Sequence, residues 1–140
     1  HSAPNFNLIP AFRKMGLECL SGYGRMMLPA LTLGASGCVD GPLCVAPERW
    51  VEIWNAYHDG DLARAQAAQD KAIELFSVLL SNGYLPALKA FTSERLGIDC
   101  GSPRPPMQQV TARLKAIIGD EAIKLGLSPA DAIMRQVDQR

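Results

Sequence analysis

Residues 17–40, LECLSGYGRMMLPALTLGASGCVD, decide the fold class, because they have the pattern of a strand, a helix and a second strand in succession. The first strand is predicted at 17–21 and runs into a Gly-Tyr-Gly turn. A helical run then ends at Gly34, and the second strand is predicted at 36–40. Strands that alternate with helices through short connections are typical of a parallel sheet with right-handed crossovers.

Helices are predicted on both sides of this stretch, from apolar residues spaced three and four apart. Two parallel strands with only helices around them would leave both sheet edges open and would bury too little apolar surface to be stable. We therefore expect a chain truncated at its N-terminus, whose missing strands lie upstream or in a partner. The predicted helices cover 7–15, 47–57, 61–80, 85–96 and about 110–118, and a last short one opens at Ser128-Pro129.

The composition is that of a globular protein, and it excludes several function classes. Of the 140 residues, 48% are apolar and 20% are charged, with 14 basic and 14 acidic side chains spread along the chain. The absence of a basic stripe argues against a nucleic-acid partner. No apolar run approaches the ~20 residues of a membrane span, so no membrane partner is expected.

The cysteines are Cys19, Cys38, Cys44 and Cys100, and no C-x-x-C pair occurs among them. His58 is the one histidine besides His1, so a Cys/His zinc site is not predicted and the expected metal content is none. Free cysteines within apolar segments are typical of a reducing compartment. We therefore predict a cytoplasmic location.

Several short motifs follow one another along the chain: LGASGCV at 33–39, AYHDGDLARA at 56–65, PALK at 86–89 and GSPRPPM at 101–107. In this order they resemble motifs of the dihydrodipicolinate synthase / N-acetylneuraminate lyase family. That family has an L-G-A-x-G-x-I strand, an A-x-x-x-G-D-x-x-x-A signature and a G-x-x-R-x-P-L turn. The order and spacing extend over nearly the whole chain, which makes the resemblance specific.

The resemblance implies a (β/α)8 TIM barrel, of which this chain would be the C-terminal part. The strands at 17–21 and 36–40 would be strands seven and eight. Residues 1–60 would form the last βα units, and 61–140 the final barrel helix region with a C-terminal helical extension. Active sites of such barrels lie at the carboxyl ends of the strands, which here means 21–25 and 39–42.

The family's chemistry, as the resemblance implies it, starts with a strand-six lysine that forms a Schiff base with pyruvate. A tyrosine on strand five moves protons. No cofactor is needed. In the family a Ser or Thr follows the lysine by two positions; Ser2 fits that position, so the lysine would immediately precede His1, outside the chain. The chain alone would then have no catalytic residue and would be inactive.

The substrate-binding residues implied by the resemblance lie on the loops after the two strands. Glycines there let backbone approach a ligand closely. The Val39 carbonyl would face pyruvate, whereas Arg25 and Asp40 would face the distal part of the substrate. From the residues alone, Arg25 could equally be a solvated surface arginine and Asp40 a cap of the turn at 41–42. The implied set is Ser2, Gly22, Gly24, Arg25, Val39 and Asp40.

The loop Gly22-Tyr23-Gly24-Arg25 departs from the sialic acid lyases, which have acidic residues after the Gly-Tyr pair. This departure puts sialic acid cleavage in doubt. An arginine at this position could hold a distal carboxylate through two parallel hydrogen bonds. The sequence does not choose between substrates.

The preferred function is a segment of a lyase or aldolase that cleaves or condenses pyruvate with a small aldehyde or 2-oxo acid. A dehydratase or deaminase that uses the same imine is a close variant. The alternatives are a non-catalytic helical interaction module and one half of a split enzyme. The expected protein partners are the missing N-terminal half-barrel and further copies of the same chain, as a homotetramer.

Overall fold

The computed structural model describes residues 5–127, so Ser2 and the helix predicted from Ser128 lie outside the described part of the chain. The chain divides into two compact units, His1–Glu74 and Leu75–Arg140. Within the described residues, no helix is long and apolar enough to cross a membrane.

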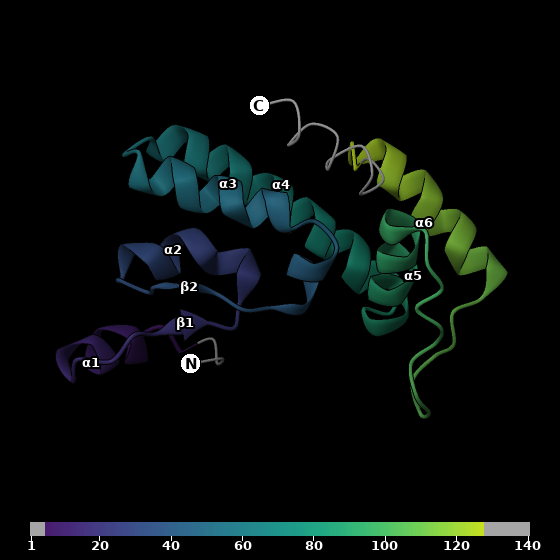
Figure 1. Ribbon diagram of the computed structural model, residues 1–140, viewed down its shortest axis with the longest axis horizontal. Helices are drawn as coiled ribbons and strands as arrows, with labels where there is room; N and C mark the ends of the chain where they lie inside the picture. Colours follow the sequence, from purple (N-terminus) through teal and green to yellow (C-terminus); the bar gives the residue numbers. More distant parts are fainter. Residues whose placement is uncertain (1–4, 128–140) are drawn as a thin grey trace. The chain divides into compact units, whose positions relative to one another are not determined.

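Two short strands form the parallel sheet that the sequence predicts (Figure 1). Strand β1 is Leu20–Ser21 and strand β2 is Gly37–Cys38, with Leu20 opposite Gly37 and Ser21 opposite Cys38. The backbone pairing extends slightly beyond the strands, because Ser36 N–H donates to the Cys19 carbonyl and Val39 N–H to the Ser21 carbonyl, both at 2.8 Å.

Both strands are shorter than the predicted ranges 17–21 and 36–40, and the connections explain why. Before Ser36 the chain still belongs to the preceding helix end, since Gly34 N–H donates to the Leu31 carbonyl at 2.8 Å and Ala35 N–H to the Ala30 carbonyl at 2.9 Å. The start of the predicted first strand therefore has no extended segment beside it with which to form strand hydrogen bonds. Within the described residues no third strand lies beside either one.

Helices surround this sheet in the first unit, and α2 lies between β2 and α3 (Figure 1). The helix predicted to end at Gly34 is split into a 3-10 turn and α2. Of the two 3-10 turns, only a turn at 41–42, within η2, was predicted. The elements are α1 (Leu8–Lys14), η1 (Gly24–Met26), α2 (Met27–Thr32), η2 (Gly41–Cys44), α3 (Pro47–His58) and the first part of α4 (Leu62–Ser81).

The core of the first unit is made by the inner faces of these helices. Asp61 begins α4 as predicted, because its Oδ1 accepts a hydrogen bond from Arg64 N–H at 2.9 Å. Trp50 and Ile53 of α3 are buried, as the spacing of apolar residues predicts for a core stripe. A further cluster joins α1, β1 and α2 through Ile9, Cys19, Ala30 and Ala35, with Phe6, Phe12 and Leu33 against it.

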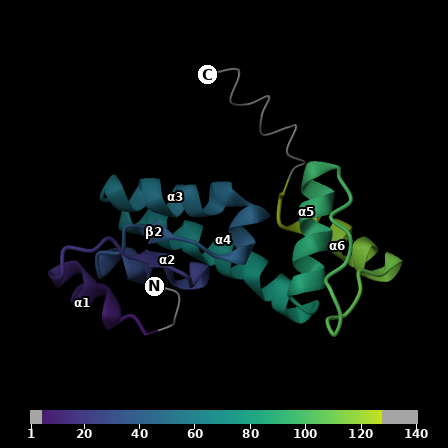
Figure 2. The same ribbon diagram turned by 60° about the horizontal axis from the view of Figure 1, so that its bottom comes forward.

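In the second unit, α5 (Leu85–Leu96) packs against α6 (Ala112–Lys124), as both views show (Figure 2). Helix α5 has the bounds that the sequence predicts. It ends where Gly97 takes the left-handed conformation, with φ of 65°. The helix predicted at about 110–118 begins later, because Thr111 is the residue that caps it, and it continues to Lys124.

Replacing Thr111 by alanine should lower the free energy of unfolding by about 1 kcal/mol, the usual effect of losing a helix N-cap. The Thr111 hydroxyl accepts a hydrogen bond from Leu114 N–H at 3.1 Å, and alanine leaves that donor without an acceptor. Urea unfolding followed by circular dichroism measures the change. Thr111→Ser, which keeps the hydroxyl, is the control. An unchanged urea midpoint for Thr111→Ala would show that the hydroxyl does not cap α6.

Candidate active site

The carboxyl ends of β1 and β2 lie side by side, so the loops that follow them form one edge of the first unit. The hydrogen bond from Val39 N–H to the Ser21 carbonyl joins these ends. Tyr23 N–H also turns back to the Ser21 hydroxyl, at 3.3 Å. In parallel α/β sheets, ligands bind at this end of the strands. We therefore take the two loops as the candidate active site.

Asp40 ties the two loops together through their backbone. Its Oδ2 accepts a hydrogen bond from Gly24 N–H at 2.7 Å, and its Oδ1 accepts one from Gly41 N–H, also at 2.7 Å. Hydrogen bonds to an ionised carboxylate are about twice as strong as neutral ones. Asp40 thus caps the 3-10 turn η2, as the turn-capping interpretation predicts, and also holds the loop that follows β1.

Two further side chains, from α3 and α4, reach the carbonyl of the same residue, Gly24. Trp50 Nε1 donates to the Gly24 carbonyl at 3.0 Å, and Gln69 Nε2 donates to the same oxygen at 3.4 Å. Gln69 Oε1 accepts a hydrogen bond from Leu28 N–H at 2.9 Å. Asp40, Trp50 and Gln69 form what we call the Gly24 clamp.

The clamp explains why position 24 is a glycine. A Cβ on Gly24 would lie 2.8 Å from Trp50 Nε1 and 3.1 Å from Asp40 Oδ2. The sequence predicted that a glycine here lets backbone approach a ligand. In the structure the close approach that requires glycine is the approach to Trp50 and Asp40. Gly22, the other glycine predicted in the site, is half-buried between β1 and Tyr23.

Arg25 follows the clamped peptide and lies against an aromatic ring. The guanidinium carbon of Arg25 is 4.5 Å from the centre of the Tyr23 ring, a cation–π distance. Tyr23 in turn lies 6.3 Å, between ring centres, from Phe6. Arg25 is partly buried. The loop therefore places a positive charge on an aromatic surface at the carboxyl end of β1.

Cys38 is the nucleophilic side chain nearest to this edge, and it is kept protonated. Burial raises the pKa of the Cys38 thiol to about 12, and the negative charge of Asp40 adds to the effect. The thiolate is the reactive form of cysteine, so Cys38 is a poor nucleophile at neutral pH.

The structure brings most of the predicted site residues to one edge. Gly22, Gly24 and Arg25 lie on one loop and Val39 and Asp40 on the other, whereas Ser2 lies outside the described residues. Val39 has 63% of its surface exposed. No lysine lies on either loop. Among residues 5–127, no three His, Cys, Asp or Glu side chains gather as a metal site would require.

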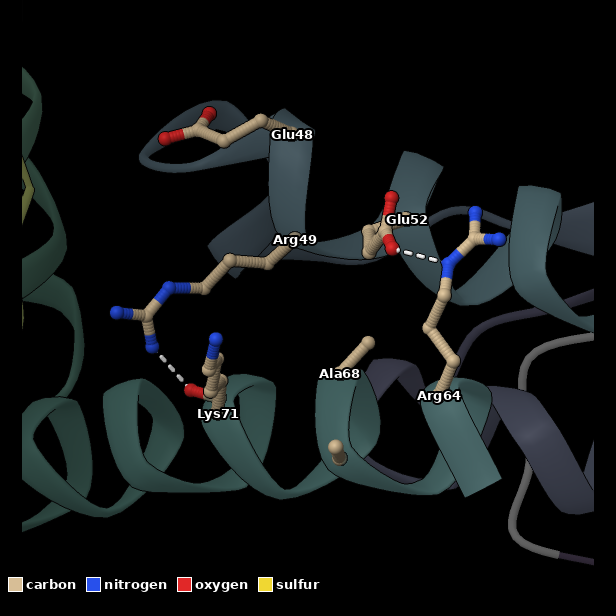
Figure 3. Close-up of a pocket in the computed structure, with 7 residues that line it drawn as sticks. Glu48, Arg49, Glu52, Arg64, Ala68 and Lys71 are labelled. Carbon is tan, nitrogen blue, oxygen red and sulfur yellow. Dashed lines mark hydrogen bonds and ion pairs between the residues drawn. The ribbon is translucent and has the colours of Figure 1, made fainter. Parts of the chain in front are cut away.

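Two hollows in the first unit lie outside these loops. An apolar groove of about 310 Å³ runs along β2 and α3, and Leu43, Val51 and Trp54 are among its lining residues. A second hollow of about 240 Å³ lies between α3 and α4 and is lined by charged side chains (Figure 3).

The charged hollow is not a good candidate for catalysis, because both of its arginines bond to other groups of the protein. Arg64 pairs with Glu52 at 2.6 Å and with Asp59 at 3.0 Å, and Arg49 donates to the Lys71 carbonyl (Figure 3). The two ion pairs raise the pKa of Arg64, whose side chain is partly exposed. Exposed pairs of this kind are common on protein surfaces.

Gln69 is the residue of this region that the sequence interpretation missed. It is 3% exposed and stands among Ala65, Ala68 and Ala72, which are buried residues of the same helix. A polar side chain on an apolar helix face is unusual, because a buried amide must find hydrogen-bond partners. The position of Gln69 among apolar residues was therefore a signal in the sequence that this side chain has a special role. The sequence alone does not identify its hydrogen-bond partners.

Known proteins resemble this chain over most of its length. A model of the dihydrodipicolinate synthetase family matches residues 7–122. A 4-hydroxy-tetrahydrodipicolinate synthase of Methanopyrus kandleri is 33% identical over 79% of this chain and 36% of its own length. An N-acetylneuraminate lyase of Clostridium perfringens is 32% identical over 82% of this chain and 40% of its own length.

Solved structures agree with these matches. CdNal of Clostridium difficile, in complex with mannosamine, superimposes with a TM-score of 0.82 at 26% identity over 89% of this chain and 43% of its own. A dihydrodipicolinate synthase of Aquifex aeolicus gives a TM-score of 0.74 at 25% identity over 93% and 45%. These neighbours are TIM-barrel enzymes, and the chain spans less than half of their length.

Replacing Gly24 by alanine should lower the free energy of unfolding by about 1–3 kcal/mol, because the added methyl group overlaps Trp50 and Asp40. Gly119→Ala in α6 is the matched control, since nothing lies within 4 Å of its added Cβ. That change should raise stability by about 0.5–1 kcal/mol, as expected inside a helix. Equal urea midpoints for the two variants would contradict the clamp geometry.

Proposed function

Because the chain belongs to the dihydrodipicolinate synthetase family, we propose that it is the C-terminal segment of a lyase or aldolase that works on pyruvate through a lysine Schiff base. The observation that supports this most is the edge where the loops after β1 and β2 meet. It combines clamped backbone, an arginine and an exposed valine at the end of the strands where barrel enzymes hold their substrates.

In this proposal β1 is strand seven of a (β/α)8 barrel and β2 is strand eight. The open edges of the two-stranded sheet support it, because strands of an intact barrel have a neighbour on both sides. Exposed apolar side chains support it as well: Leu17 is 51% exposed, Leu20 45% and Val39 63%. The preceding strands of the barrel would remove these side chains from water.

The lysine of the reaction would immediately precede His1, so that Ser2 takes the polar position that follows it in the family. Its amine condenses with the pyruvate ketone, which releases one water molecule. The protonated imine accepts the electron pair of the neighbouring carbon–carbon bond during cleavage and returns it during condensation. The second product or substrate is an aldehyde or a related 2-oxo acid.

The residues of this chain would bind and orient the substrate. The backbone at Gly22 and Val39 borders the pyruvate moiety. Arg25 binds a carboxylate at the distal end, since a guanidinium offers two parallel donors to a carboxylate. The Tyr23 ring, 4.5 Å from the guanidinium carbon, supports the guanidinium from one side.

Borohydride trapping tests the Schiff base. The protein is expressed from its native coding sequence, with whatever precedes His1, and is reduced in the presence of pyruvate. Intact mass and peptide mapping should then show one reduced pyruvyl adduct on a lysine just before His1. Without pyruvate no adduct should form.

The same measurement separates the alternatives. An adduct on a lysine of another polypeptide that co-purifies would identify a split enzyme. No adduct on any chain would contradict the lyase proposal and favour a non-catalytic module.

Replacing Arg25 by alanine should weaken binding of substrates with a distal carboxylate. The probes are 2-oxoglutarate, which has that carboxylate, and 2-oxopentanoate, which has the same chain length without it. In Arg25→Ala the half-saturating concentration of 2-oxoglutarate in the trapping reaction should rise about tenfold or more, the loss expected for hydrogen bonds between charged groups. Pyruvate and 2-oxopentanoate should change less than about twofold.

The control for Arg25 is Arg49→Ala, which removes the same charge from α3 at the charged hollow (Figure 3). It should leave all three half-saturating concentrations unchanged. If Arg25→Ala behaves like Arg49→Ala, Arg25 does not bind the distal carboxylate.

A further inference from the structure

The side-chain amide of Gln69 joins two points of the loop that carries Arg25. Its NH₂ group donates to the Gly24 carbonyl at 3.4 Å, and its oxygen accepts from Leu28 N–H at 2.9 Å. Gly24 is the first residue of η1 and Leu28 the second residue of α2, so Arg25 lies between the two bonded points. One rigid, planar group therefore fixes the distance between the two ends of the loop.

Leu28 N–H needs this partner. It is in the first turn of α2, where backbone N–H groups have no acceptor within the helix. The N-cap residue Met26 provides no side-chain acceptor, and Leu28 is 7% exposed. Gln69 is thus the cap of α2, supplied from α4. Loss of the Gln69 side-chain oxygen would leave the buried Leu28 N–H group without an acceptor. The loop would then favour a different backbone conformation.

The other two members of the clamp hold the Arg25 loop at one end only. Asp40 and Trp50 contact Gly24, and neither bonds to the far end of η1. With Gln69 removed, the Gly24 end would stay anchored, while the segment from Arg25 to Leu28 could turn about it. The direction of the Arg25 side chain depends on that turn.

We propose that Gln69 is a positioning residue that sets the selectivity of the site for the distal group of the substrate. It acts through the backbone of Arg25 and does not touch the substrate. The inference rests on the proposed function, because the distal group matters only if the loop binds a substrate. It adds to that function a selectivity determinant on a helix beyond the strand-end loops.

The test compares Gln69→Met with the unaltered protein, both expressed from the native coding sequence. Methionine has a similar volume and cannot form either hydrogen bond. The readout is the ratio of the half-saturating concentrations of 2-oxopentanoate and 2-oxoglutarate in borohydride trapping. This ratio should fall about fivefold or more in Gln69→Met, whereas pyruvate trapping should change less than about twofold.

Two further variants make the result specific. Gln66→Met changes an exposed glutamine of the same helix, whose amide bonds only to Asp70 at 2.9 Å, and it should leave the ratio unchanged. Gln69→Glu keeps the acceptor for Leu28 N–H and loses the donor to Gly24. It should therefore give a ratio between those of the unaltered protein and Gln69→Met.

A merely structural role would lower stability and alter all three probes together. If Gln69→Met fails to fold, the ratio in Gln69→Glu and the amide hydrogen exchange of Leu28 decide the question. An unchanged ratio in the folded variants, or a ratio of one in the unaltered protein, would overturn the inference while pyruvate trapping still supports the lyase. No pyruvate adduct on the unaltered protein would overturn both.

Discussion

The backbone of one residue, Gly24, is held by three side chains, and the arrangement of the first unit depends on it. Its N–H group binds the Asp40 carboxylate, and its carbonyl binds the Trp50 indole and the Gln69 amide. These partners come from the loop after β2, from α3 and from α4. Because buried backbone groups need partners, each of these elements is fixed relative to the end of β1. The strand ends, the helices and the candidate site are therefore joined through a few atoms.

Local patterns were enough to predict most of the elements. Helix α5 has its predicted bounds, because Pro86 near its start and Gly97 at its end act on the backbone next to them. The parallel pairing of β1 and β2 followed from their order with a helix between them. The strands were predicted too long, because a strand extends only as far as a second strand pairs with it. Here the segment that pairs with the first strand begins only at Ser36.

In the candidate site, only the residues that belong to a recognisable family motif could be predicted from the sequence. Arg25 and Asp40 lie on adjacent loops, as the family resemblance implied. The contribution of Gln69 comes from 45 residues further along the chain than Gly24, and no local pattern connects the two. The roles of Gly24 and Asp40 also differ from the prediction, because in the structure both hold the backbone of the two loops in place. Ser2 lies outside the described residues, so its place in the site stays a prediction.

The clamp also limits how this sequence can diverge. A side chain at position 24 would need the space that Trp50 Nε1 now occupies, 2.8 Å from the position of a Cβ. A smaller residue at position 50 would provide that space but would take away one donor from the Gly24 carbonyl. Gln69 would then be left as the remaining donor from the clamp to that oxygen. Positions 24, 50 and 69 should therefore covary among homologues, and an ancestral change at one of them would be tolerated only on backgrounds that already differ at another.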